Sequence, residues 1–231
     1  MLMRNLILAS ALALAACNPP APEAEAPEPA IPVNVATGVY TLDPNHTTVT
    51  ASARHFGLSD YVLRFNGVTG TLNFNAEDPA LSTIEATVDV ATLDTPFTGA
   101  RDFDAELQNS EWLDAAGFAT ATFRSTAVER TGPNTARVTG DLTIKGATHP
   151  LVLEVAYNAS HAQHPMGAPV SLIGFSAQGQ ILRSQYGVNT LMASAGGGDG
   201  VSDAVSIQIE AEFTRPVEGA PPVRQPQEPV N

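Results

Sequence analysis

The 231-residue chain has little of what several classes of protein require. Lys145 is its only lysine, its formal charge is −13, and aromatic residues make up only 6% of it. Binding to nucleic acid or to anionic lipid needs clustered basic side chains, so this composition argues against both. Neither H-E-x-x-H nor G-x-S-x-G occurs in the chain. We therefore predict no enzymatic activity, no cofactor and no metal site.

Cys17 is the only cysteine, so no disulfide can form within the chain. It follows Arg4 and an apolar run, residues 6–16, that is too short to span a bilayer, which together resemble a secretory signal. The stretch Leu14-Ala-Ala-Cys17 resembles the lipobox of bacterial lipoproteins, in which the cysteine after the cleavage site carries the lipid. A plain signal peptide with an incidental cysteine is the alternative.

These features predict a signal peptide over residues 1–16 and a lipidated Cys17 that anchors the exported chain to a membrane on the periplasmic side. Asn18 follows Cys17, where many lipoproteins kept at the inner membrane have aspartate. This difference favours the outer membrane over the inner membrane.

Eleven of the 18 prolines lie in two terminal segments. Residues 17–38 are rich in Pro, Ala and Glu, which favours an extended spacer, and residues 216–231 form a second Pro-rich tail, predicted to be disordered. Between them, residues 39–215 are predicted to form one domain.

Within this domain the dominant pattern is alternation of apolar and polar residues, which is typical of strands. The clearest case is residues 205–213, VSIQIEAEF. One segment, residues 101–108, has Phe103 and Leu107 at helical spacing and predicts a short helix. About eight antiparallel strands with one apolar face each fit a sandwich or a closed barrel.

The inner faces of the predicted strands carry many small residues, which favours a barrel that encloses a cavity over a solidly packed sandwich. The alternative is that the phenylalanines interdigitate with the small residues and fill the space. The residues predicted to line the pore are Val49, Ala51, Ala53, Phe74, Ala86, Val88, Phe123, Gly140, Leu142, Phe175, Ala177, Gly179, Ile207 and Ile209.

Two polar residues, His55 and Arg183, continue apolar faces. Because an unpartnered buried charge is costly, both are expected at strand ends near a rim. They either bond to neighbouring carboxylates or loop carbonyls, with Asp102 or Asp104 as candidates for Arg183, or face a ligand. A catalytic role for His55 as a general base needs a second group within hydrogen-bond reach, and the sequence identifies none.

Several motifs resemble the YceI-like, polyisoprenoid-binding domain. The segment 40–49 (YTLDPNHTTV) resembles that family's "Y-x-L-D-x-x-H-S", and residues 54–57 (RHFG) resemble its "H-x-G". Residues 140–150 (GDLTIKGATHP) and 183–188 (RSQYGV) are similar to two later motifs, and together the matches cover the predicted domain in order. Thr47 departs from the family's serine, and Gly117 stands where proline is common.

The resemblance implies an all-β fold, an extended antiparallel lipocalin-like barrel with a hydrophobic pore that takes up an isoprenoid tail. The expected function is non-enzymatic binding of an isoprenoid lipid, such as a quinone or polyprenyl carrier, with His55, Arg101 and Arg183 at the pore mouth. The alternative is a structural or stress-response envelope lipoprotein with a filled barrel. The prediction leaves protein partners open, a homodimer among them.

Overall fold

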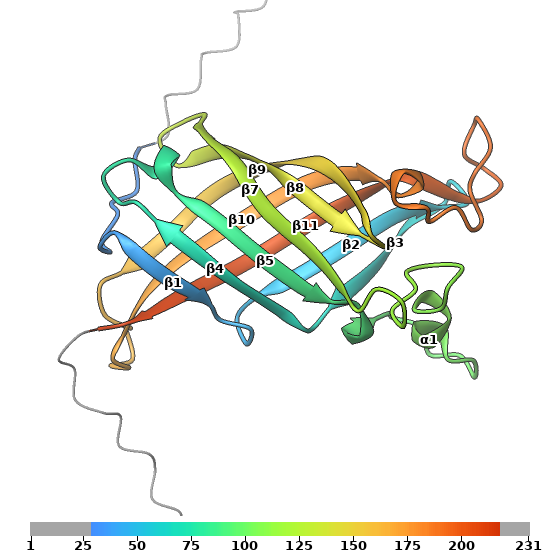
Figure 1. Ribbon diagram of the computed structural model, residues 1–231, viewed down its shortest axis with the longest axis horizontal. Helices are drawn as coiled ribbons and strands as arrows, with labels where there is room; N and C mark the ends of the chain where they lie inside the picture. Colours follow the sequence, from blue (N-terminus) through green and yellow to red (C-terminus); the bar gives the residue numbers. More distant parts are fainter. Residues whose placement is uncertain (1–28, 218–231) are drawn as a thin grey trace, which may run out of the picture.

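The computed structural model describes residues 29–217, and this part of the chain forms an elongated antiparallel barrel (Figure 1). The predicted signal peptide, Cys17 and nearly all of the predicted tail lie outside the described residues. The strands are β1 (Gly38–Leu42), β2 (Thr48–His55), β3 (Ser59–Phe65), β4 (Val68–Phe74), β5 (Thr83–Asp89), β6 (Leu93–Asp94), β7 (Thr120–Arg130), β8 (Thr135–Ile144), β9 (Ala147–His161), β10 (Val170–Leu182) and β11 (Val201–Pro216).

The named strands combine into a simple up-and-down order. β1 and β2 both pair with β11, one after the other along its length. On their other side, β1 pairs with β4 and β2 pairs with β3. β5 then pairs with β4, and β6 with β3. The result is a closed barrel of eight long strands, as the sequence predicts, in which the first strand pairs with the last.

The first long strand is interrupted between β1 and β2 by a turn at Asp43. Pro44 follows it and has no N–H to contribute to a strand ladder. The Asp43 carboxylate accepts a hydrogen bond from the Asn45 backbone N–H at 2.9 Å, and the Asp43 carbonyl accepts one from His46. This local turn separates the two halves of the strand without breaking the barrel.

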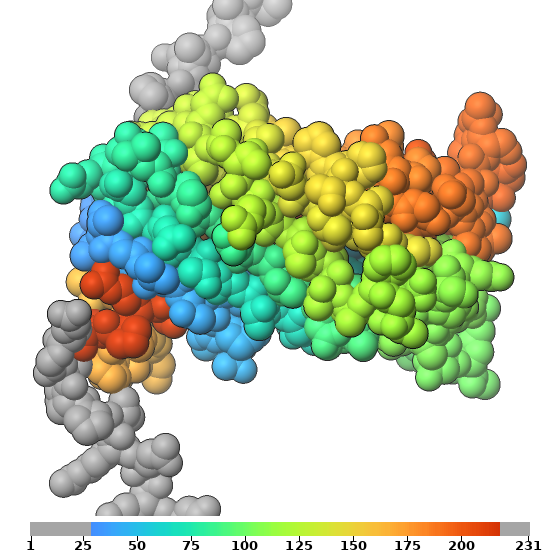
Figure 2. All heavy atoms as spheres, viewed as in Figure 1, coloured from blue at the N-terminus to red at the C-terminus, as the bar shows by residue number. Residues whose placement is uncertain are grey.

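The strand ends meet at two opposite ends of the barrel, which we call the tail end and the helix end. The tail end carries segments 29–37, 75–82, 131–134 and 162–169, and the helix end carries segments 56–58, 95–119, 145–146 and 183–200. In Figure 2 the green atoms of the segment 95–119 cover the helix end on the visible face, and orange atoms of the segment 183–200 project beside them.

Residues 29–37, which we call the N-terminal segment, belong to the predicted spacer but pack against the tail end. Val35 is buried in a core cluster with Tyr40, Phe74, Ile173 and other residues of β1, β4, β10 and β11. The backbone of the segment is hydrogen-bonded to side chains of the barrel. The spacer composition therefore extends beyond the point where packing begins.

The predicted helix is present as α1 (Phe103–Leu107), shorter at both ends than residues 101–108. Asp102 precedes it, and its carboxylate accepts a hydrogen bond from the Ala105 N–H at 2.9 Å, as an N-cap does. Three 3₁₀ helices accompany α1 among the described residues: η1 (Pro79–Leu81), η2 (Val90–Thr92) and η3 (Arg183–Tyr186). Within residues 29–217 no helix has the length and apolar character needed to cross a membrane.

Candidate functional site

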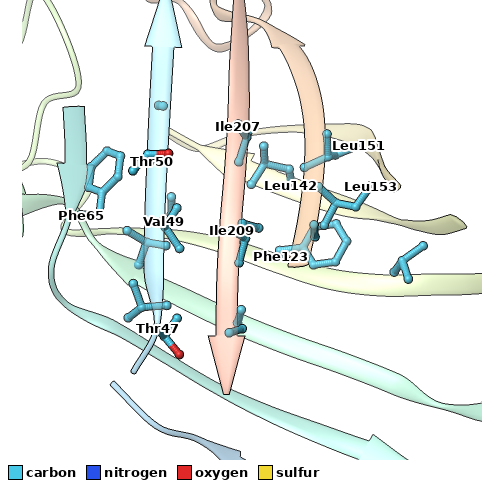
Figure 3. Close-up of a pocket in the computed structure, with 18 of the residues that line it drawn as sticks. Thr47, Val49, Thr50, Phe65, Phe123, Leu142, Leu151, Leu153, Ile207 and Ile209 are labelled. Carbon is cyan, nitrogen blue, oxygen red and sulfur yellow. The ribbon is translucent and has the colours of Figure 1, made fainter. Parts of the chain in front are cut away.

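An elongated cavity of about 830 Å³ runs through the barrel. At the tail end it reaches Ile31, Val33 and Asn134, and at the helix end it reaches Phe97, Phe103 and Trp112. Between these ends its wall is made of inward-facing aliphatic and aromatic side chains from nearly every strand. Figure 3 shows part of the wall, with Ile207 and Ile209 on β11 and Leu142, Leu151 and Leu153 beside them.

The structure places twelve of the fourteen predicted pore residues in the cavity wall. They are Val49, Ala51, Ala53, Phe74, Ala86, Val88, Phe123, Leu142, Phe175, Ala177, Ile207 and Ile209. The alternation of side chains along each strand brings them to one interior. Of the two alternatives for the interior, the hollow barrel is the one observed, and ligand contact by these residues stays a prediction.

Gly140 and Gly179 are not in the cavity wall, and this part of the prediction is wrong. A Cβ added at Gly140 would lie 2.4 Å from the Phe123 ring. One added at Gly179 would lie 2.9 Å from the side chain of Leu153. Neighbouring large side chains therefore occupy the space that these glycines leave, and it is they that face the cavity.

Small wall residues set the width of the cavity along β2. Ala51 and Ala53 face inward, yet neither is fully buried, because the space in front of them is open. On β3, across the hairpin, Leu63 pairs with Ala51 and Tyr61 with Ala53. A larger side chain at either alanine would project into the cavity.

His55, Arg101 and Arg183 all lie in the cavity wall at the helix end, so the structure brings the three predicted mouth residues to one end. His55 is the last residue of β2, and its ring packs edge-on against Phe56 at 4.5 Å between centroids. Its other aromatic neighbour is Tyr61, at 6.2 Å. These contacts are those of a packed wall residue.

Arg183 holds the backbone of the helix end together. The residue is only 6% exposed, and its side chain donates four hydrogen bonds of 2.8–3.0 Å to backbone carbonyls. The acceptors are the carbonyl oxygens of Val188, Thr190, Val201 and Ser202. Burial lowers the pKa of Arg183, partly offset by the charge of Asp203.

The predicted carboxylate partners of Arg183 are engaged elsewhere. Asp102 caps α1, and Asp104 accepts hydrogen bonds from the N–H and hydroxyl of Thr95 at 3.0 and 2.6 Å. The alternative that Arg183 bonds to loop carbonyls is the one observed. Because four of the five guanidinium N–H groups are used in this way, Arg183 has little capacity left for a ligand.

Arg101 lies at the same end and is more exposed. Its guanidinium is 3.3 Å from the Glu106 carboxylate. It also lies over two aromatic rings, 4.6 Å from the centroid of Phe103 and 5.2 Å from that of Phe97. The charge of Arg101 is therefore paired, and its flat group covers aromatic rings at the cavity mouth.

The N-terminal segment forms a part of the cavity wall that the sequence analysis did not predict. Asn134 accepts a hydrogen bond from the Ile31 N–H at 2.7 Å and donates one to the Pro29 carbonyl at 2.9 Å. The Ser160 hydroxyl accepts from the Asn34 N–H, and the Tyr157 hydroxyl donates to the Pro32 carbonyl. The available signal was the alternation of Ile31, Val33 and Val35, which continues the strand pattern into the predicted spacer.

A metal centre has no support in the part of the chain that the structure describes, since no three His, Cys, Asp or Glu side chains gather there. The cavity wall is instead dominated by carbon and carries few polar groups. Such a site can bind an apolar molecule of substantial length.

Comparison with known proteins agrees with this geometry. The model of the family described as "YceI-like domain" matches residues 40–213. A UPF0312 protein of Shewanella oneidensis is 29% identical over 159 residues, covering 68% of this chain and 80% of the relative. A UPF0312 protein of Pseudomonas syringae pv. tomato is 32% identical over 151 residues, covering 64% and 76%.

Solved structures share the fold. The crystal structure of Burkholderia cenocepacia BcnA superposes with a TM-score of 0.61 at 23% identity, over 74% of this chain and 98% of that one. A Saccharophagus degradans domain, described as a polyisoprenoid binding domain implicated in plant cell wall breakdown, gives a TM-score of 0.55 at 11% identity, over 77% and 98%.

Proposed function

Since the chain belongs to the YceI-like domain family, we propose that it is a non-enzymatic carrier or reservoir that holds an isoprenoid lipid inside its barrel. The observation that carries the proposal is the continuous apolar cavity of about 830 Å³. The S. degradans neighbour, named for polyisoprenoid binding, supports the same class of ligand.

The dimensions of the barrel suit a long, thin ligand. β10 has 13 residues, which at ~3.3 Å rise and a tilt of ~40° span about 33 Å along the barrel axis. The cavity reaches residues at both ends of this length. A polyprenyl or a prenylated quinone has this shape, whereas a compact ligand would leave much of the wall without contact.

The energetics favour an apolar chain. Each CH₂ group withdrawn from water contributes on the order of 0.8 kcal/mol, reduced by the cost of immobilising the chain and the ligand as a whole. A tail of several isoprene units therefore gains enough from burial to bind without any charged contact. The filled-barrel alternative is disfavoured because the side chains leave the interior open.

The cellular setting completes the proposal. A lipidated Cys17 would tie the exported chain to a membrane on the periplasmic side, with the outer membrane favoured. Residues 18–28 lie between Cys17 and Pro29, so a short spacer would separate the anchor from the barrel. The N-terminal segment brings that spacer to the tail end of the cavity.

Uptake of a fluorescent polyprenyl analogue tests the ligand class. We expect Ala53→Phe and Ala177→Leu to reduce uptake at least about tenfold, because each places carbon atoms in the cavity. Gln178→Leu, at an exposed position on β10, is the matched control. Circular dichroism checks that each variant keeps the barrel. Uptake that is equal in all four proteins, or absent from the unaltered one, would contradict the proposal.

A further inference from the structure

The N-terminal segment contributes apolar side chains to the wall of the cavity at its tail end. Ile31 and Val33 line the cavity there, beside Ala30. Two residues further along, Val35 is buried in the core cluster of the barrel and is 8% exposed. In Figure 1 the blue start of the described chain lies at this end of the barrel, before β1. The segment is therefore part of the closure of the cavity as well as a connection to the barrel.

Hydrogen bonds to the barrel fix the backbone that carries these two side chains. The Ile31 N–H donates to the side-chain oxygen of Asn134 at 2.7 Å, and the side-chain amide of Asn134 donates to the Pro29 carbonyl at 2.9 Å. The residues on either side of Val33 are bonded to barrel side chains as well, at 2.9 and 2.7 Å. Ile31 and Val33 thus have fixed places at the end of the cavity.

The helix end of the cavity has a cover that is more costly to displace. Phe103 and Trp112 line the cavity there, and Arg183 and Lys145 hold the covering loops through six hydrogen bonds to backbone carbonyls. Residues 29–34 are bonded to the barrel only through neutral side chains. A ligand longer than the cavity would therefore displace the tail-end cover first.

The two side chains lie outside the region that the chain shares with its family. The match to the YceI-like domain begins at residue 40, after the N-terminal segment. Any limit that Ile31 and Val33 place on the ligand is thus a property of this chain, added to the barrel by the residues that precede it.

We propose that Ile31 and Val33 determine the longest isoprenoid chain that the cavity accepts. This inference rests on the proposed function and adds to it a specificity for chain length. A ligand that fills the cavity contacts both side chains, and a longer one is excluded by them. Alanine at both positions removes three carbon atoms and two, as many as one isoprene unit contains, so the cavity should then accept about one further unit.

The test uses a series of prenyl-benzoquinones that differ only in the number of isoprene units. Their affinities are measured by competition with the fluorescent polyprenyl analogue, for the unaltered protein and for the double variant Ile31→Ala/Val33→Ala. Each affinity is divided by that of the unaltered protein for the same probe, so the solubility of the probe cancels. We expect this ratio to stay within about twofold of one for short tails and to rise at least about fivefold for the longest.

The matched control is Leu81→Ala/Val39→Ala, which also removes three carbon atoms and two at the tail end. Leu81 and Val39 are 67% and 58% exposed, and neither lines the cavity. The control should give a ratio near one for every probe. Melting temperatures check that both double variants keep the barrel.

A second variant, Ile31→Trp, changes the limit in the opposite direction and does not depend on loosening the segment. The larger side chain shortens the cavity, so we expect short tails to bind within about twofold of the unaltered protein. The longest tail that the unaltered protein accepts should bind at least about fivefold more weakly. Val39→Trp is its control and should leave all affinities unchanged.

The outcomes separate the inference from the function on which it rests. If no probe of any length binds to the unaltered protein, the proposed function itself fails. If the probes bind but the ratios of the Ile31 variants do not depend on tail length, only the inference fails. The same dependence on length in the Leu81 and Val39 controls would also overturn the inference, because these residues lie outside the cavity wall.

Discussion

The two ends of the barrel are closed in different ways. At the tail end, mainly neutral side chains hold the N-terminal segment: Asn134, Tyr157 and Ser160 are bonded to its backbone, and one cation, Arg215, donates to the Thr37 carbonyl at 2.9 Å. At the helix end, cations hold the covering loops: Arg183 binds four carbonyls, and the Lys145 ammonium donates to two more at 3.1 and 2.7 Å. Irregular segments have no strand ladder to satisfy their backbone, so side chains take that role at both ends.

This difference indicates that opening the two ends of the barrel costs different amounts of free energy. The helix end buries a charged group with several bonds, which makes its cover costly to disrupt. The tail end relies on a few hydrogen bonds and on the buried Val35, and Pro29, Ala30 and Val33 of its segment are exposed. Segments with little buried apolar surface open at low free energy. We therefore expect the tail end to open more readily.

The largest effect is expected from breaking the helix end with Arg183→Met. The change leaves four backbone carbonyls without their donor, and we expect a loss of about 3 kcal/mol in the free energy of unfolding, measured with denaturant. Arg64→Met, at an exposed position on β3, is the matched control and should cost less than about 0.5 kcal/mol. Equal losses in the two variants would show that Arg183 does not hold this end.

A smaller effect is expected from loosening the tail end with Asn134→Ala. The variant loses both hydrogen bonds to the N-terminal segment, and we expect a cost of about 1 to 2 kcal/mol in the free energy of unfolding. Hydrogen exchange at the amides of Ile31 and Asn34 should accelerate, whereas amides of the segment 183–200 should not change.

The control for this prediction is Asn158→Ala, because Asn158 is exposed on β9 and its side chain donates to the Ser176 hydroxyl rather than to the N-terminal segment. It should leave exchange in the N-terminal segment unchanged. Faster exchange at the helix end in Asn134→Ala would show that the two ends open together and are not independently closed.

The fold was predictable because alternation along a strand is a local property. The pattern at residues 205–213 assigns Ile207 and Ile209 to the interior, and the structure places both in the cavity wall. The same pattern failed at Gly140 and Gly179, because alternation assigns a residue to a face and not to the open part of that face. Only the placement of the large neighbouring side chains reveals that the space there is filled.

The polar features of the site were harder to predict. The interruption of an apolar face marked Arg183, but its four acceptors come from a loop and a strand start whose path the sequence does not specify. Asn134, Tyr157 and Ser160, which hold the N-terminal segment, lie far from it in the sequence. Only the folded barrel brings them to its tail end.

The central claim is that the cavity holds an isoprenoid lipid, and native mass spectrometry of the full-length protein, purified from membranes under mild conditions, tests it most directly. We predict a bound species that is released on unfolding, contains a prenyl tail, and is depleted in Ala53→Phe but not in Gln178→Leu. A protein that carries no lipid, or an adduct that Ala53→Phe leaves unchanged, would contradict the account.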